Sequence, residues 1–244
     1  MNGRAVSGDD PGPAWSLVVF CFNEAGTIEA VVRGAADVAE QLAPGSWEVV
    51  VVDDGSTDGT SEIVERLELA GVRLVRHPAN RGIGPALRTG YREARGALVV
   101  AIPGDGQFDV RELLEVGPVA PDEVVTFVRG HRPEYGLGRR GLSAANRWLL
   151  GRLLGTELRD VNWIKVYRRS SLASIQLTLD SSLVESEICA KLARRGHRFR
   201  EIPSTYHPRS HGEAKGASPR TIAQALRDLV PLVHAVRADA EARP

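Results

Sequence analysis

Short apolar runs separated by helical patterns are the feature that most constrains the fold of this chain. Each run is continuous and rich in β-branched residues, which is typical of strands buried on both faces of a parallel sheet. Three runs are strong, and a fourth, Val72–Val75, is weaker. The strong runs are Ser16–Phe22, Trp47–Val52 and Leu98–Ile102.

The segments between these runs carry apolar residues at helical spacing. The expected helices are Ala25–Leu42, Thr57–Leu69 with Ser56 or Thr57 as N-cap, and Gly84–Ala94. Because strands and helices alternate, the pattern predicts right-handed βαβ units. We therefore expect an α/β fold with a doubly wound, mostly parallel sheet and helices on both faces.

The pattern is less regular after residue 117. We expect strands at Val124–Val128 and Phe199–Ile202, a loop at Arg129–Arg140, and helices at Leu142–Leu154, Ser182–Arg194 and Thr221–Val236. The last helix is amphipathic, contains Pro231, and has an expected apolar side of Leu226, Leu229, Val230, Val233 and Val236. The expected organisation is a disordered leader (1–14), one domain (15–216) with halves 15–117 and 118–216, and a C-terminal helix and tail (217–244).

Charge and cysteine content exclude some function classes. Lys plus Arg and Asp plus Glu are equal at 31 each among 244 residues, which argues against a general nucleic-acid binder. Cys21 and Cys189 lie in apolar segments and are expected to be buried thiols, in keeping with a reduced, cytoplasmic setting. No run approaches the roughly 20 apolar residues of a spanning helix, so any membrane contact is expected to be peripheral.

Polar residues follow each of the three strong strands. They are Asn23-Glu24 after the first, Asp53 to Thr60 after the second, and Gly104 to Gln107 after the third. Ligands of open α/β sheets bind beyond the carboxyl ends of the strands, so these side chains are expected to converge on one crevice. One carboxylate there can accept a hydrogen bond from a nucleobase N–H. Another can hold a hard divalent cation beside a diphosphate, and Asp105 with the side-chain amide of Gln107, two residues further on, is the candidate for this role.

Four segments together resemble the successive motifs of family 2 glycosyltransferases with the GT-A fold. They are VVFCFNE, VVVDDGSTDGT, NRGIGPALRTG and GDGQFDVREL. The resemblance is greatest to the polyprenol-phosphate (dolichol-phosphate) mannosyl or glucosyl synthases and covers roughly Ser16 to Lys215. It implies inverting transfer of a sugar from a GDP- or UDP-sugar donor, with Mg²⁺ or Mn²⁺ as cofactor.

The resemblance also implies roles for particular residues. Those expected at the nucleotide-sugar are Phe20, Phe22, Glu24, Val52, Asp54, Pro103, Gly104 and Asp105, with Val52 and Asp54 at the base. Those expected at the metal are Asp105 and Gln107. Those expected to serve catalysis are Asp105, Arg132, Arg209 and Lys215.

The chain departs from the family pattern at two places. Phe20 and Phe22 stand where Pro and Tyr are usual, and the Asp-x-Asp motif is Pro103-Gly104-Asp105, without its first carboxylate. One metal ligand or ribose contact is therefore missing. This departure keeps open a second hypothesis, a protein that binds a nucleotide-sugar without catalysis.

A basic set in the second half points to a phosphate acceptor. Arg132 lies in the Gly-rich loop, and Arg209 and Lys215, in HPRSHGEAK, resemble an Arg-x-x-Gly-x-x-Lys element. Arg and Lys can grip phosphate, whose second pKa of about 6 leaves it anionic at neutral pH. Such an acceptor, for example a polyprenyl phosphate, needs no general base.

Other readings remain open from the sequence. A small-molecule hydroxyl acceptor would also suit this fold. A dinucleotide oxidoreductase is disfavoured because no G-x-G-x-x-G follows the first strand.

The last helix can cap the core or lie on a membrane surface. Asp160 and Glu187 are expected to form buried ion pairs, and His77 is expected to be an ordinary surface or core residue.

Overall fold

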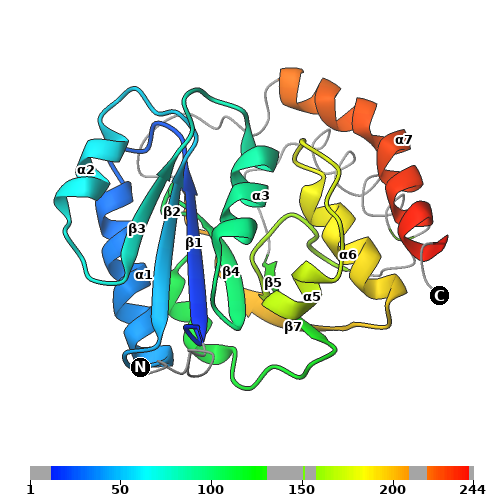
Figure 1. The fold of residues 1–244 in the computed structure, drawn as a ribbon, viewed down its shortest axis with the longest axis horizontal. Coiled ribbons are helices and arrows are strands. Elements are labelled where there is room, and N and C mark those ends of the chain that lie inside the picture. Colours follow the sequence, from blue (N-terminus) through cyan, green and yellow to red (C-terminus); the bar gives the residue numbers. More distant parts are fainter. Residues whose placement is uncertain (1–11, 131–150, 152–157, 209–218, 242–244) are drawn as a thin grey trace, which may run out of the picture.

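The first half of the computed structural model alternates strands and helices (Figure 1). The structure describes residues 12–130, 151, 158–208 and 219–241. The elements of this half are β1 (Trp15–Cys21), α1 (Ile28–Leu42), β2 (Trp47–Asp53), α2 (Thr60–Arg66), β3 (Val72–Arg76), α3 (Ile83–Glu93), β4 (Leu98–Pro103) and the short 3₁₀ helix η1 (Val110–Glu115). All the strands and helices expected in this half are present.

The second half adds three strands to the same sheet. Its elements are β5 (Glu123–Arg129), β6 (Lys165–Arg168), α5 (Arg169–Ala173), α6 (Val184–Arg194), β7 (Arg198–Ser204) and α7 (Pro219–Glu241). The strand β6 and the short helices η1 and α5 were not expected from the sequence. The predicted Leu142–Leu154 helix and nearly all of the predicted Arg129–Arg140 loop lie outside the described residues.

The seven strands form one sheet in the order β3-β2-β1-β4-β6-β5-β7. The first four strands are parallel to one another, and β5 and β7 are also parallel. The strand β6 is antiparallel to both of its neighbours, β4 and β5. The prediction of a doubly wound, mostly parallel sheet is therefore confirmed, with one antiparallel strand between its two parallel parts.

Helices cover both faces of this sheet. Along β1, Leu17 and Val19 pack into a core with α1, α2 and η1, while Val18 packs into a second core with α3, α5 and α6. The alternation follows from the period of two in a strand, which sends successive side chains to opposite faces. Apolar residues on both faces explain why the strands read as continuous apolar runs.

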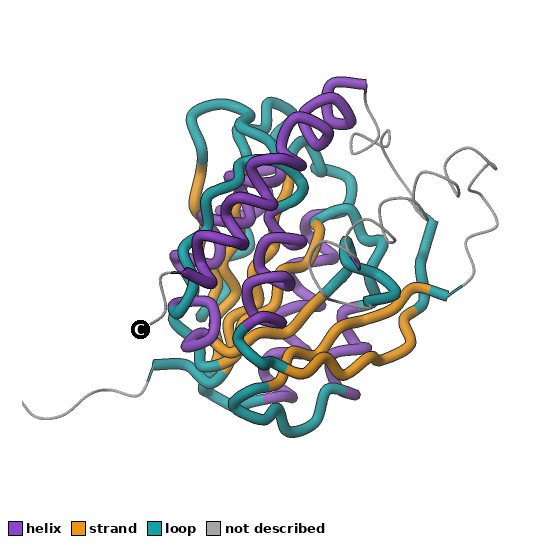
Figure 2. Tube along the Cα trace, turned by 90° about the vertical axis from the view of Figure 1, so that its right-hand side faces the viewer, coloured by secondary structure: helices purple, strands orange, loops and turns teal. Residues whose placement is uncertain are grey.

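Helix α7 packs on the outside of α6 (Figures 1 and 2). Leu232 and Val236 are buried against it in a third cluster, and Arg195 pairs with Asp239 at 2.6 Å. The expected apolar side was wrong at Val230, which is 64% exposed, and it omitted Leu232. Among the described helices, none is both long enough and apolar enough to cross a membrane.

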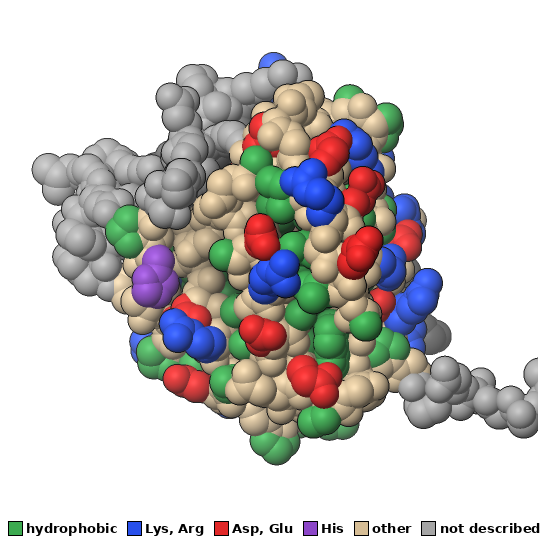
Figure 3. Space-filling model, turned by 90° about the vertical axis from the view of Figure 1, so that its left-hand side faces the viewer, with side chains coloured by type: hydrophobic (Ala, Val, Ile, Leu, Met, Phe, Trp, Pro, Cys, Tyr) green, Lys and Arg blue, Asp and Glu red, His purple; other side chains and the backbone are tan. Residues whose placement is uncertain are grey.

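One margin of the predicted organisation can be compared with the structure. Pro13 and Ala14, assigned to the leader, are hydrogen-bonded to Ala97, Ser46 and Leu98, while residues 1–11 lie outside the described part. On the side of α1, α2 and β3, acidic and basic side chains are interspersed over the described surface (Figure 3).

Candidate functional site

The carboxyl ends of β1, β2 and β4 lie side by side at one edge of the sheet. The register places Cys21 opposite Asp53 on one side and Phe20 opposite Pro103 on the other. Adjacent strands are about 4.8 Å apart, so chain segments leaving β2 and β4 start within about 10 Å of each other, on either side of β1. The three strand ends therefore lie close together, as the strand order requires.

Hydrogen bonds join the loop after β1 to the loop after β2. The Asn23 N–H donates to Ser56 Oγ at 2.8 Å, and the Thr57 N–H donates to Asn23 Oδ1 at 2.8 Å. The Glu24 N–H donates to Thr60 Oγ1 at 2.9 Å. These bonds fix the backbone of the Asn23-Glu24 pair against the start of α2.

The loop after β4 is joined to β1 in the same way. The Gly104 N–H donates to the Phe20 carbonyl at 2.9 Å, and Thr27 Oγ1 donates to the Gly104 carbonyl at 2.7 Å. A Cβ at Gly104 would lie 2.9 Å from the Cys21 Cβ, so a side chain there has no room. The three strand-end loops therefore form one packed unit.

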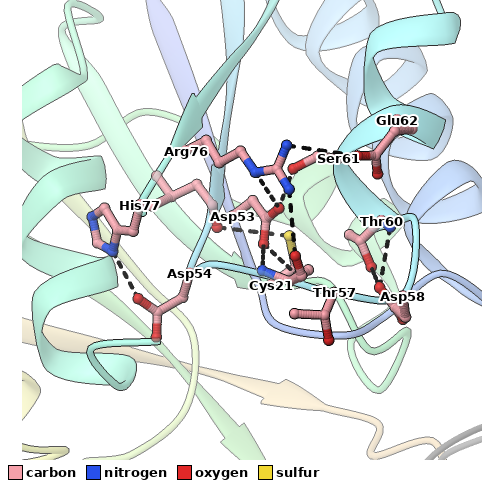
Figure 4. A network of polar contacts seen from close by, with 12 residues as sticks. Cys21, Asp53, Asp54, Thr57, Asp58, Thr60, Ser61, Glu62, Arg76 and His77 are labelled. Carbon is pink, nitrogen blue, oxygen red and sulfur yellow. Dashed lines mark hydrogen bonds and ion pairs between the residues drawn. The ribbon is translucent and has the colours of Figure 1, made fainter. Parts of the chain in front are cut away.

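Asp53 and Asp54 have different surroundings although they are adjacent (Figure 4). Asp53 is fully buried and accepts from the Ser56 N–H at 2.9 Å and from the hydroxyls of Ser56 and Ser61. The predicted N-cap of α2 was wrong: Gly59 holds that position, and the Ser56 hydroxyl is engaged by Asp53 instead. Asp53 therefore braces the turn.

Asp54 joins the end of β2 to the start of α3. Its carboxylate lies 2.7 Å from His77 Nδ1 and accepts from the Arg81 N–H and, at 2.7 Å, from the Gly82 N–H. His77 Nε2 lies 3.0 Å from Thr89 Oγ1 on α3. An anion at a helix N-terminus is favourable, since the helix dipole and its N–H groups both point at it.

The site therefore includes a residue whose role the sequence did not reveal. His77 is a buried core residue, as one of the two expectations allowed, but it also fixes the Asp54 carboxylate. The motifs at the strand ends do not include His77, so they do not predict this contact.

The pKa of the Cys21 thiol is shifted by its burial and by carboxylates of the strand-end loops. Burial raises its pKa well above the ordinary value, and the carboxylates of Asp53, Glu24, Asp58 and Asp54 raise it further. These carboxylates come from the ends of two strands, β1 and β2. The same shift makes Cys21 a poor nucleophile.

The turn after β4 holds Asp105 and Gln107. Asp105 is buried, and its Oδ1 accepts from the Gln107 N–H at 3.0 Å. Gly106 has φ +72°, which favours glycine. The Gln107 amide donates to the Tyr206 hydroxyl, so residues 99 positions apart meet at this turn.

The turn fits a divalent cation that is shared with a substrate. Within the described residues, no three His, Cys, Asp or Glu side chains are arranged to hold a metal ion. Mg²⁺ is commonly held by one or two carboxylates, with substrate phosphates and water completing its shell. Asp105 can supply one carboxylate, whereas Pro103, at the end of β4, supplies none.

The other expected nucleotide-binding residues differ in exposure. Glu24 is 9% exposed, Phe20 and Phe22 are half-buried, and Val52 is fully buried in the core on the α3 side. The Val52 side chain is therefore enclosed by protein. The backbone carbonyl of Val52 lies 3.7 Å from the Cys21 Sγ.

The expected catalytic cations lie outside the described residues. They are Arg132, Arg209 and Lys215. The expected buried ion pairs are confirmed: Asp160 pairs with Arg129 at 2.7 Å, and Glu187 pairs with Lys191 at 2.7 Å.

Comparison with known proteins agrees with this arrangement. The model of "Glycosyl transferase family 2" matches residues 16–174. A dodecaprenyl-phosphate galacturonate synthase of Rhizobium johnstonii is 30% identical over 91% of this chain and 67% of its own length. Glycosyltransferase AglJ of Haloferax volcanii is 30% identical over 81% of this chain, which spans 64% of that relative.

Solved structures share the fold. Glucosyl-3-phosphoglycerate synthase from Mycobacterium tuberculosis, in complex with UDP, has a TM-score of 0.66 at 23% identity, covering 93% of this chain and 81% of that one. A mannosyltransferase from Pyrobaculum calidifontis, in complex with GDP-Man and Mn²⁺, has a TM-score of 0.62 at 24% identity, covering 96% and 72%.

The family match covers more than half of the chain and includes the ends of β1, β2 and β4. The chain belongs to glycosyl transferase family 2.

Proposed function

We propose that this protein transfers a sugar, with inversion, from a nucleoside-diphosphate sugar to a polyprenyl phosphate, assisted by Mg²⁺ or Mn²⁺. The observation that carries the proposal is the joining of three strand-end loops into one unit that bears Glu24, Asp54 and Asp105. The acceptor is supported by the Rhizobium relative, whose name specifies dodecaprenyl phosphate.

The nucleoside is assigned to the β1 and β2 side of the site. Asp54 and Glu24 supply carboxyl groups there, and the half-buried Phe22 lies in the loop after β1 that also bears Glu24. A carboxylate oxygen can accept from a nucleobase N–H, and an aromatic ring can pack against a base. Asp54 is held by His77, Arg81 and Gly82, so its position is set before any ligand binds.

The diphosphate is assigned to the β4 side. Asp105 would hold the divalent cation, which supplies charge neutralisation for the diphosphate leaving group. The Gln107 N–H orients the Asp105 carboxylate, and Gln107 itself lies next to it in the turn. Burial of Asp105 strengthens its electrostatic interactions with a ligand.

Polyprenyl phosphate is an acceptor that can attack without a base. Its phosphate is anionic at neutral pH, as expected from a second pKa of about 6 for phosphomonoesters. A phosphate oxygen attacks the anomeric carbon on the face opposite the leaving diphosphate, which inverts that centre. Arg132, Arg209 and Lys215 are the cations that we assign to the phosphates, on the basis of their sequence motifs.

The test is a transfer assay with matched acceptors. Labelled UDP- and GDP-sugars are incubated with polyprenyl phosphate or with a free sugar hydroxyl acceptor, each with Mn²⁺ or with EDTA. We expect metal-dependent transfer to polyprenyl phosphate, with inverted anomeric configuration by NMR. Efficient transfer to the hydroxyl acceptor alone would overturn the proposed acceptor, and nucleotide-sugar binding without any transfer would favour the non-catalytic hypothesis.

A further inference from the structure

Gln107 is held by three different groups around the turn after β4. Its N–H donates to Asp105 Oδ1 at 3.0 Å, and its carbonyl accepts from the His207 N–H at 3.1 Å. Its side-chain amide donates to the Tyr206 hydroxyl. Gln107, whose N–H orients the Asp105 carboxylate, is therefore itself held by the segment that follows β7.

Tyr206 is held in turn by two aromatic residues, Phe108 and Trp163. Phe108 forms a β-bridge with Tyr206, and the Trp163 ring lies 5.9 Å from the Tyr206 ring between centroids. Phe108 and Trp163 also meet edge to face at 5.9 Å. Such contacts between rings hold the tyrosine side chain in one orientation.

A buried cation completes this arrangement. The Arg129 guanidinium lies 4.3 Å from the centroid of Trp163 and 5.9 Å from that of Tyr206. Asp160 binds the same guanidinium through two hydrogen bonds, at 2.7 and 2.8 Å. Trp163 Nε1 donates to Ser204 Oγ at 2.9 Å, so the indole is held at both its face and its edge.

We propose that Tyr206 is a positioning residue for the metal-binding turn, acting through Gln107 on the Asp105 carboxylate. The inference rests on the proposed function, because it assigns Tyr206 a role at the cation that Asp105 would hold. Tyr206 does not need to touch the cation. Its hydroxyl restrains the Gln107 side chain, and the restraint reaches Asp105 through the Gln107 N–H.

The proposal separates the hydroxyl of Tyr206 from its ring. The contact with Trp163 requires only the ring, and the β-bridge to Phe108 requires only the backbone, so Tyr206→Phe retains both. The loss of the hydroxyl removes one neutral hydrogen bond at the turn. A restraint of that size changes a binding constant about fivefold.

The experiment measures binding of Mn²⁺ with UDP, and with GDP, by calorimetry and by Mn²⁺ electron paramagnetic resonance. We compare the wild-type chain, Tyr206→Phe and the matched control Tyr91→Phe. The Tyr91 hydroxyl donates to Glu185, in the buried interface between α3 and α6, so the control removes a phenol hydroxyl from a different place. UDP and GDP binding in EDTA and thermal unfolding are measured for each chain.

We expect Tyr206→Phe to weaken binding of the Mn²⁺–nucleotide pair about fivefold. Nucleotide binding in EDTA should be unchanged. Tyr91→Phe should lower the unfolding temperature and leave the Mn²⁺–nucleotide affinity unchanged. Equal Mn²⁺–nucleotide affinities of Tyr206→Phe and wild type, or an equal loss with and without metal, would overturn the positioning role alone. Absence of any Mn²⁺–nucleotide binding by the wild-type chain would overturn the proposed function together with it.

Discussion

The buried carboxylate that ends β2 and the carboxylates around β5, β6 and α6 are stabilised in different ways. At the end of β2, Asp53 accepts from the Ser56 N–H and from the Ser56 and Ser61 hydroxyls, with the Arg76 guanidinium 4.0 Å away. Around β5 and β6, the carboxylates pair with buried or half-buried cations. These pairs are Arg129 with Asp160, Lys165 with Glu185 and Lys191 with Glu187.

The carboxylates around β5, β6 and α6 are compensated by cations of the protein itself, whereas Asp53 is held mainly by neutral donors. An ion pair buried within the protein is neutral as a unit and stabilises a fixed arrangement only while both partners remain. At the strand ends, the carboxylates of Asp53, Glu24, Asp58 and Asp54 all contribute to raising the pKa of the buried Cys21 thiol. A site of that kind attracts a cation, which suits metal-assisted binding of a diphosphate.

The largest expected effect is at the strand-end site. Asp105→Ala should reduce sugar transfer at least about a hundredfold, because it removes the carboxylate assigned to the cation that stabilises the leaving group. Steady-state assays at saturating Mn²⁺ measure the loss. Asp109→Ala is the matched control, since Asp109 lies four residues on and pairs with Arg111 at the surface. Comparable losses in both variants would mean that the metal site is misplaced.

The second prediction breaks an ion pair in the other part of the sheet. Glu187 is fully buried and accepts from Lys191 and from the Thr178 and Leu179 N–H groups. Glu187→Ala should lower the free energy of unfolding by about 3–5 kcal/mol, because it leaves a buried cation unpaired. Urea denaturation at pH 7 measures the change.

The exposed pair of Glu29 and Arg33 provides the control for this loss. Both side chains are at least half exposed, so Glu29→Ala should cost no more than about 0.5 kcal/mol. The folded fraction of Glu187→Ala should still bind nucleotide with wild-type affinity. Loss of nucleotide binding in that fraction would contradict the separation of the two regions.

The third prediction concerns acid stability at the start of α2. Burial raises the pKa of Asp58, but hydrogen bonds from Thr60 and from the Ala25 N–H lower it more, so the net shift is downward. Its contribution to stability is therefore present above the unfolded pKa of about 3.9 and is lost as the pH falls through the lower folded value. Asp58→Asn should remove this part of the acid dependence.

The magnitude of the Asp58 effect is small. Asp58 is exposed at the surface, so after allowance for solvent screening we expect at most about 0.5 kcal/mol. Denaturation midpoints of the wild type and Asp58→Asn between pH 3 and 6 measure it. A wild-type contribution that grows as the pH falls would contradict the sign.

The smallest effect is expected from thiol reagents. Burial raises the pKa of Cys21 well above its usual value and that of Cys189 to about 11. The folded protein should not react with a disulfide reagent at pH 8, and both thiols should react in denaturant. Rapid reaction of Cys21 in the folded state would mean that the strand ends open.

The fold was predictable from the sequence wherever the residues of a single strand or helix show a clear apolar pattern. β1, β2 and β4 are continuous apolar runs, and the helices between them are strongly periodic. β6 escaped prediction because it has only four residues, beginning with Lys165 and ending with Arg168. A lysine is buried there because Glu185, twenty residues further on, neutralises it.

Only those site residues that lie in short sequence motifs next to a strand end were predictable from the sequence. Glu24, Asp54 and Asp105 follow strands directly, so the topology alone brings them together. His77 and Tyr206 contact the site across 23 and 99 residues of sequence, and nothing in their local pattern predicts those contacts.

The most direct test of the strand-end site is a crystal structure of the protein with Mn²⁺ and UDP or GDP, using the anomalous signal of manganese. The account predicts a manganese peak about 2.1 Å from an Asp105 carboxylate oxygen, with the diphosphate in contact with it and the base beside Glu24 and Asp54. A nucleotide bound in this crevice with manganese remote from Asp105, or a nucleotide bound elsewhere on the protein, would contradict it.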